Sequence, residues 1–256
     1  MKLLKTALCA AVASLALAGV ANAAVVINAG AATEYVFRGL IQGSDAGFAG
    51  ADWTQDGKTP QFYAGTWFSA VGFGPQAEND WYAGWTPSAG GVNFDFGAIY
   101  YGYWNDYEHY VNYKNGHFDK NVSAPYYEVK AVATLPIGMS SIKGSIFYSP
   151  NFFAETGAAT YYEGAFSTPW KGMTFSGAVG EQTIAHVTPG NFACNSDKCS
   201  SSYTTWNFGV TIPVNEHFSV DARYIGSSSK AETFGNANLE EAGFNGIAAT
   251  LKATLP

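Results

Sequence analysis

The sequence is poor in positive charge and in the patterns that usually mark an enzyme. Its 13 lysines and arginines, of which only Arg38 and Arg223 are arginines, face 20 acidic residues, so the formal net charge is −7. Because no basic patch is present, we do not expect nucleic acid as a partner. Nucleophile motifs, zinc-ligand spacings and phosphate-binding glycine loops are also missing, so we expect no enzyme, no cofactor and no metal site.

Long apolar runs are scarce. Outside the N-terminal region no run approaches the roughly 18–20 residues that a membrane-spanning helix requires. The run Ala7–Val20 follows a lysine-bearing start and leads into an A-x-A motif at 21–23, a pattern typical of a Sec-type signal peptide. We therefore predict that residues 1–23 are cleaved and that 24–256 form the exported protein. A membrane anchor is the alternative, but the run is short and ends in small residues.

Cysteine is also rare, with three in the chain. Cys9 lies inside the N-terminal apolar run, which leaves Cys194 and Cys199. An even pair in an exported protein predicts a disulfide. The small ring that it closes would add roughly 2 kcal/mol of stability in the chain-entropy model. A metal site is the alternative, but only His186 is near in sequence as a further ligand.

What the chain has in abundance is aromatic residues in alternating segments. Aromatic residues make up 16% of the chain and charged residues only 13%, with a mean hydropathy of −0.04. Segments of period-two alternation predict strands. There are twelve: 28–39, 46–55, 60–71, 79–87, 91–104, 125–135, 140–149, 159–168, 172–184, 203–213, 217–227 and 245–255. They predict an all-β fold, namely a transmembrane antiparallel β-barrel of about 12 strands. A secreted β-sandwich is the alternative, but it would not need tryptophans at so many strand ends.

The connections between these segments alternate in length. Five are short and rich in Pro, Gly, Asn and Asp, as hairpin turns are. They are 55–59, 87–90, 136–139, 169–171 and 214–216. Among the others, 42–45 is brief, while 105–124, 185–202 and 228–244 are long. This layout predicts short turns in the periplasm, longer loops outside, and location in the outer membrane of a Gram-negative bacterium.

The alternation also assigns the two faces of each strand. Val129, Ile142 and Val220 belong to apolar faces directed at lipid, because a lysine or arginine at the lipid midplane would cost about 2–4 kcal/mol. The charged residues on the opposite faces should then line the lumen: Glu34, Arg38, Asp52, Asp80, Asp95, Glu128, Lys130, Lys143, Glu163, Asp221, Arg223 and Lys252. They either form a transverse field across a pore or pair with one another structurally. We hypothesise that Arg38 and Arg223 contribute to a cationic stripe.

The stretch Thr33–Gln42 is expected to be a wall strand that runs into a tight turn, with Tyr35 and Phe37 on the lipid side. Its sequence Tyr-Val-Phe-Arg-Gly-Leu-Ile-Gln at 35–42, with Phe-Tyr-Ala-Gly-Thr-Trp at 62–67, resembles the TorF-type porins of proteobacterial outer membranes. The resemblance implies an outer-membrane barrel of porin type and no catalytic residues. The chain's Thr-Leu-Pro ending departs from the aromatic last residue of many barrel proteins.

Together these features predict a passive channel for small hydrophilic solutes or ions, surrounded by outer-membrane lipid and lipopolysaccharide. A twelve-stranded barrel is wider than the eight-stranded type that side chains fill, so a narrow or partly plugged channel is expected. One alternative is a non-channel barrel that binds or adheres through its external loops. Another is a lipid hydrolase at the rim, with His186 near Thr183 or Ser200. The sequence leaves the solute and the oligomeric state open.

Overall fold

The computed structural model describes residues 23–55, 61–72, 76–104, 110–114, 117–122, 124–185, 200–229, 231 and 243–256. Residues 1–22 of the predicted signal peptide lie outside these ranges. Cys194, Cys199 and His186 lie outside them too, so the signal peptide and the disulfide stay predictions.

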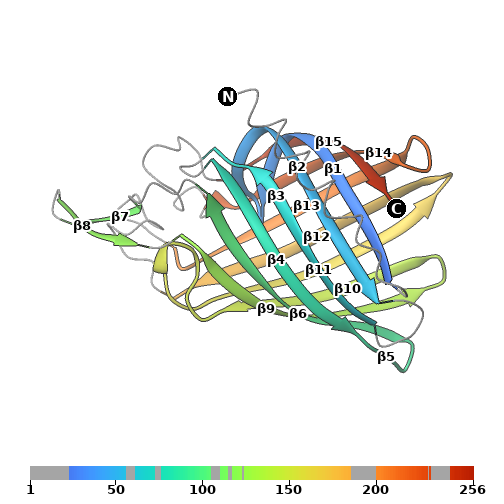
Figure 1. Cartoon of the computed structure of the whole chain (residues 1–256), viewed down its shortest axis with the longest axis horizontal. Coiled ribbons are helices and arrows are strands. Elements are labelled where there is room, and N and C mark those ends of the chain that lie inside the picture. Colours follow the sequence, from blue (N-terminus) through green and yellow to red (C-terminus); the bar gives the residue numbers. More distant parts are fainter. Residues whose placement is uncertain are drawn as a thin grey trace.

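Twelve antiparallel strands make up the wall of a closed barrel within the described residues (Figure 1). They are β1 (Ala23–Phe37), β2 (Leu40–Gln55), β3 (Gln61–Ala70), β4 (Ala77–Thr86), β6 (Val92–Trp104), β9 (Tyr126–Ile137), β10 (Ser140–Ser149), β11 (Ala159–Trp170), β12 (Met173–Ile184), β13 (Ser202–Pro213), β14 (Phe218–Ser227) and β15 (Gly246–Leu255). Each pairs with its neighbours in the chain, and β1 closes the ring against β15. The predicted twelve-stranded barrel is therefore confirmed.

Three small elements are added to this wall. The two-residue strand β5 (Ser88–Ala89) pairs with the start of β6. A hairpin of β7 (Tyr110–Lys114) and β8 (His117–Val122) lies in the long connection between β6 and β9, where no strand was predicted. Phe153–Glu155 form a single 3-10 turn. Among the described residues, no helix is long and apolar enough to cross a membrane.

The two ends of the barrel differ, as the sequence predicted. At one end the strands are joined by tight turns, with positive φ at Gly138, Lys171 and Gly172. We call this the short-turn end; it is on the right in Figure 1. At the opposite, long-connection end, strands such as β6 and β9 or β12 and β13 are joined by longer segments.

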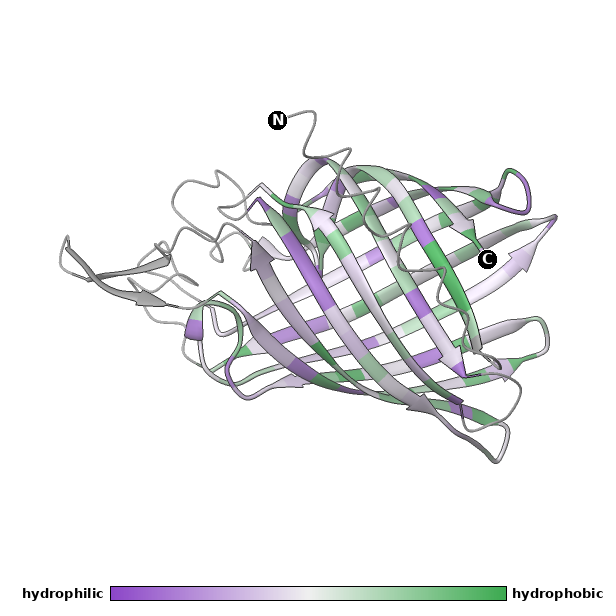
Figure 2. Ribbon diagram, viewed as in Figure 1, coloured by the Kyte–Doolittle hydropathy of each residue, from purple (hydrophilic) through white to green (hydrophobic). Residues whose placement is uncertain are grey.

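The outer surface of the wall is apolar and the inner surface polar. Hydropathy alternates along the strands in Figure 2. On the outside, Ile142, Val179 and Phe208 are 54%, 56% and 53% exposed. On the inside, Glu128 and Gln182 are 1% and 0% exposed. A surface that exposes large apolar side chains and hides carboxylates suits lipid rather than water, which is the pattern of a transmembrane barrel.

One part of the wall does not follow the prediction. β15 pairs with β1 only as far as Ala32, and β3 pairs with β2 only from Phe48 onward. Between these points β1 and β2 continue as a two-stranded hairpin whose turn is Arg38–Gly39. We call the hairpin Thr33–Gly47 the arm. The predicted turn at 42–45 was wrong, because positive φ at Arg38 (48°) and Gly39 (77°) closes the chain earlier, in a turn of only two residues.

We predict that the cost of a charge on the outer face depends on its depth. Val179 is level with Gly164 and Gly144 in the register, near the middle of three strands. Val179→Arg should destabilise the barrel by about 2–4 kcal/mol, whereas Val214→Arg, in the turn after β13, should cost about 0–1 kcal/mol. Urea unfolding in lipid vesicles measures both. Equal costs would mean that the apolar belt does not lie in hydrocarbon.

Candidate functional site

The tip of the arm is held by a buried ion pair across the lumen. Arg38 Nη1 and Nη2 donate to the two carboxylate oxygens of Glu128 on β9, at 2.8 and 2.7 Å. Nη1 also donates to Oε1 of Gln182 on β12, at 2.9 Å. The side chains of Arg38 and Glu128 are 6% and 1% exposed. Bidentate contacts between a guanidinium and a carboxylate are strong and fix the orientation of both groups.

Aromatic rings surround the same guanidinium. Its central carbon lies 4.6 Å from the ring centre of Phe37, 5.0 Å from that of Phe147 on β10 and 4.4 Å from that of Tyr161 on β11. Such cation–π contacts strengthen when water is excluded. Arg38 therefore contacts β9, β10, β11 and β12 at once, although none of these strands neighbours β1 or β2 in the wall.

Further contacts hold the arm on its other sides. The Tyr35 hydroxyl donates to Glu78 on β4 at 2.5 Å, and the Phe37 ring packs edge-on against Tyr101 of β6. The carbonyl of Gly39 accepts from the Phe244 amide at 2.8 Å. Leu40 packs against buried residues at the ends of β11, β12 and β13, among them Ile184. The arm thus crosses the lumen near the long-connection end.

This placement corrects the expectation for Thr33–Gln42. Tyr35 and Phe37 were predicted to face lipid, but their partners Glu78 and Tyr101 lie on the inner wall. The alternation was interpreted correctly as a strand, yet both faces of this strand are enclosed by the barrel. An aromatic residue at a strand position fits either environment, and only the tertiary contacts distinguish them.

Most of the remaining predicted lumen charges are found in pairs. Lys130 lies 2.6 Å from Asp95, Lys143 3.1 Å from Glu163, and Arg223 3.1 Å from Asp221. Of the two alternatives left open by the sequence, structural pairing therefore describes these side chains better than a transverse field. Arg38 and Arg223 do not form a free cationic stripe, since each contacts its own carboxylate.

Four predicted lumen residues have other surroundings. Asp52 accepts hydrogen bonds from Asn28 and Tyr82, and Glu34 accepts one from Ser44. Asp80 is 8% exposed, and its Oδ1 has no hydrogen-bond partner among the residues that the structure describes. Lys252 on β15 is in register with Gly30 and makes no ion pair within the described part of the chain.

Two polar partners of the arm, Glu78 and Gln182, were missed at the sequence level. Glu78 shares the inner face of β4 with Asp80, but the predicted strand began at 79, and β4 begins at Ala77. Gln182 bears no charge, so nothing in the sequence separates it from other polar residues of β12. A strand start placed two residues earlier would have identified Glu78.

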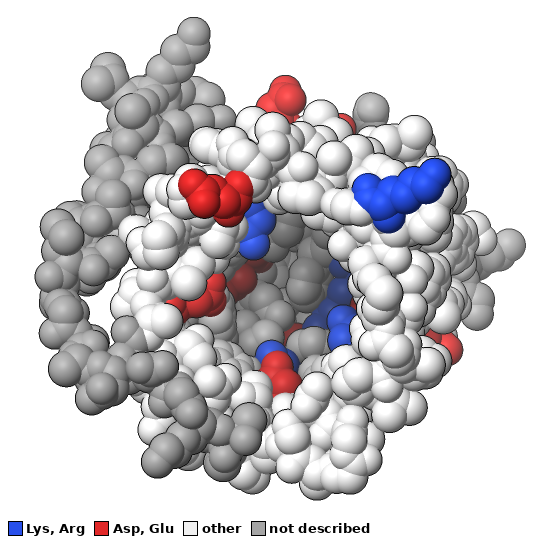
Figure 3. Space-filling model, turned by 90° about the vertical axis from the view of Figure 1, so that its right-hand side faces the viewer, with Lys and Arg blue, Asp and Glu red and all other residues white. Residues whose placement is uncertain are grey.

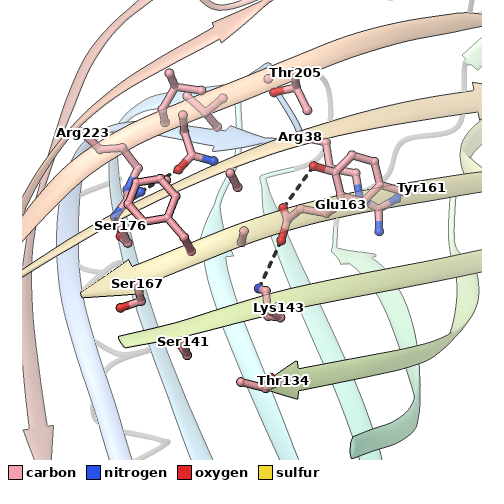
Figure 4. Close-up of a pocket in the computed structure, with 18 residues that line it drawn as sticks. Arg38, Thr134, Ser141, Lys143, Tyr161, Glu163, Ser167, Ser176, Thr205 and Arg223 are labelled. Carbon is pink, nitrogen blue, oxygen red and sulfur yellow. Dashed lines mark hydrogen bonds and ion pairs between the residues drawn. The ribbon is translucent and has the colours of Figure 1, made fainter. Parts of the chain in front are cut away.

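A cavity of about 450 Å³ lies in the lumen beside the arm. Val36, Arg38 and Gly39 of the arm line one part of it, and Ser141 and Ser167, near the short-turn end, line another. Figure 3 shows the short-turn end hollowed, with acidic and basic side chains inside the opening. Figure 4 shows the labelled side chains projecting from the strands toward this space. The arrangement is a polar vestibule that ends at the arm.

Comparisons with known proteins agree with this fold. A family model described as "Bacterial protein of unknown function (Gcw_chp)" matches residues 18–255. Among solved structures, the NanC porin is similar with a TM-score of 0.54 at 7% identity, over 91% of this chain and 100% of that one. The KdgM porin is similar with a TM-score of 0.52 at 8% identity, over 90% and 98%. No curated protein sequence matches. At such identities the likeness shows the fold alone.

We predict that Arg38 and Glu128 are strongly coupled. Arg38→Met or Glu128→Gln alone should destabilise the barrel by about 3–5 kcal/mol, because each leaves a buried polar or charged partner unpaired, and the double variant should lose less than the sum. The matched control is the Lys143–Glu163 pair, in which the lysine side chain is 42% exposed. Lys143→Met, Glu163→Gln and their double variant should each cost about 1 kcal/mol or less. Urea unfolding of the six variants measures this. Equal losses for Arg38→Met and Lys143→Met would contradict the coupling.

Proposed function

The chain belongs to the Gcw_chp family of bacterial proteins of unknown function, and we propose that it is an outer-membrane channel for the passive diffusion of small hydrophilic solutes, narrowed by its own arm. The observation that carries this proposal is a closed, lipid-suited barrel whose inner face is polar and whose lumen the Thr33–Gly47 hairpin crosses. The proposal includes no catalytic step, cofactor or metal.

The two faces of the wall support the proposal. A protein that only anchored external loops could fill its barrel with apolar side chains, as soluble cores are filled. Here the lumen instead contains ion pairs such as Lys143 with Glu163, and a cavity of about 450 Å³. Transmembrane barrels have a polar interior both when they contain a water-filled channel and when they are plugged, and the cavity here supports the channel. Outer-membrane lipid and lipopolysaccharide would contact the apolar belt.

The arm supports a narrow passage rather than a wide one. It lies across the lumen at the long-connection end, where the Arg38–Glu128 pair and the aromatic rings fix its tip. Any solute that leaves the vestibule toward that end must pass beside the arm or displace it. The selectivity of such a channel follows from its narrowest section and the groups that line it.

Likeness to known porins supports the same function. The NanC and KdgM structures are porins by their titles, and one of the KdgM structures is in complex with disordered oligogalacturonate. The sequence at 35–42 resembles the TorF-type porins. In this structure that stretch forms most of the arm, which gives the signature residues Phe37, Arg38 and Gly39 a shared role at the constriction.

We predict that the purified barrel produces small conductance steps in planar bilayers bathed in salt solution. Replacing both arm anchors, in Arg38→Ala with Glu128→Ala, should enlarge the steps, because the tip of the arm loses its ion pair. The control is Val214→Ala, in a turn outside the lumen. Complete absence of conductance from correctly folded protein would reject the channel and favour the alternative, a barrel that acts through its external loops.

A second prediction tests the arm directly by tethering it. A Cβ atom at Gly39 would lie 3.0 Å from Cβ of Thr205 on β13 and 2.9 Å from Cβ of Ser227. The turn must therefore move slightly to reach the roughly 3.5–4.5 Å that disulfides span, and the positive φ of Gly39 adds backbone strain that Gly39→Cys alone shares. Gly39→Cys with Thr205→Cys should, when oxidised, keep the small conductance even in the Arg38→Ala background, and reduction should release the larger steps. Gly39→Cys alone, treated with the same reductant, is the control. If the oxidised tether left the conductance of the Arg38→Ala variant unchanged, the position of the arm would not determine the width of the channel.

A further inference from the structure

The inner wall beside the arm contains a recess built from small side chains in register. One row runs across four strands: Ser141 on β10, Ser167 on β11, Ser176 on β12 and Gly209 on β13. The next row toward the arm contains Ala165 and Ala178, which also face each other. Because none of these side chains is longer than a hydroxymethyl group, the wall is hollowed here, and the cavity of about 450 Å³ includes this hollow.

Longer polar side chains bound the recess on both flanks. On one flank, Lys143 Nζ lies 3.1 Å from Glu163, whose other oxygen accepts from the Tyr161 hydroxyl at 3.2 Å (Figure 4). On the other flank, Arg223 donates to Asn207 at 2.6 Å and to Ser176 at 2.8 Å. Arg223 reaches Ser176 across Gly209, where a side chain would lie 2.9 Å from the arginine Cβ.

Each of the three cations that line the cavity, Arg38, Lys143 and Arg223, is paired with a carboxylate, so the three ion pairs together carry no net charge. Lys143 is paired with Glu163, and Arg223 with Asp221. An ion entering the recess would lose hydration without meeting a free countercharge, which is unfavourable. A neutral solute does not bear this cost.

Hydrogen-bonding capacity nevertheless remains unused. An ammonium group has three donors and a side-chain amide two, and Lys143 makes one ion pair while the Asn207 amide nitrogen has no partner among the described residues. Ser141 and Ser167 likewise make no side-chain hydrogen bond within that part of the chain. Hydroxyl groups of a solute both donate and accept, so they suit this mixture of serines, an amide and paired charges.

We propose that this recess is a binding site for a neutral, polyhydroxylated solute of the size of a mono- or disaccharide. The substrate class rests on the proposed channel, because the vestibule gives the solute its access. A volume of about 450 Å³ falls within the roughly 300–1,000 Å³ of small-molecule pockets. Ala165 and Ala178 offer an apolar floor to the C–H face of a sugar ring, while Ser141, Ser167, Lys143 and Asn207 meet its hydroxyls.

Binding is tested without relying on conduction, by saturation-transfer NMR of sucrose and of glucuronate with the barrel in detergent micelles. Sucrose should give the stronger signal. Ala178→Leu fills the recess and should weaken sucrose binding by roughly tenfold or more through steric conflict. Glu163→Gln leaves Lys143 without its carboxylate and should reverse the preference toward glucuronate.

The control for bulk is Ala131→Leu, an alanine in register with the exposed Ile146 and Phe96 on the outer face; it should leave sucrose binding unchanged. Stronger binding of glucuronate than of sucrose by the unaltered protein, or equal sucrose signals from Ala178→Leu and Ala131→Leu, would overturn the proposal. Bilayer recordings separate the two failures: sucrose binding without conductance would reject the channel alone, and conductance without sucrose binding would reject the recess site alone.

Discussion

The need to satisfy every backbone amide and carbonyl within hydrocarbon governs this molecule. Lipid offers no hydrogen bonds, so a sheet inside a membrane must have no free edge. The pairing of β1 with β15 meets that condition, and the remaining wall strands follow from it as successive antiparallel neighbours. The same condition sets the side-chain pattern, because each strand has one face in lipid and the other in the lumen.

The arm meets the same condition because it folds away from the wall into the lumen. Beyond Ala32 and Phe48, β1 and β2 have no wall partner on their outer edges, so these edges could not remain in lipid. Inside the barrel they find polar partners, among them Gly72, whose amide donates to Gln42, and Phe244, whose amide donates to Gly39. Burying Arg38 would be costly by itself, and Glu128 and Gln182 offset that cost on the opposite wall. The constriction and the ion pair therefore depend on each other.

The sequence alone predicted the wall well and the arm poorly. Period-two alternation identifies strands such as β9 and β14 because one of their faces is uniformly apolar, as lipid requires. The same rule misplaced Tyr35 and Phe37, since it cannot distinguish an aromatic side chain in lipid from one packed inside the barrel. The lumen charges were recognisable individually, but their pairing was not: Arg38 and Glu128 are 90 residues apart, and only closure of the barrel brings them together.

The asymmetry of the inner face explains where the lumen cavity lies. A twelve-stranded ring is too wide for ordinary side chains to fill evenly. On the β2–β6 side, large residues occupy the interior, such as Trp67 stacked on Phe48 and Tyr82 bonded to Asp52. On the β10–β13 side, the inner positions between the charged flanks are serine, alanine and glycine. The arm occupies the long-connection end but leaves this second side free toward the short turns. The cavity of about 450 Å³ therefore lies off-centre, against the wall with the small side chains and the paired charges.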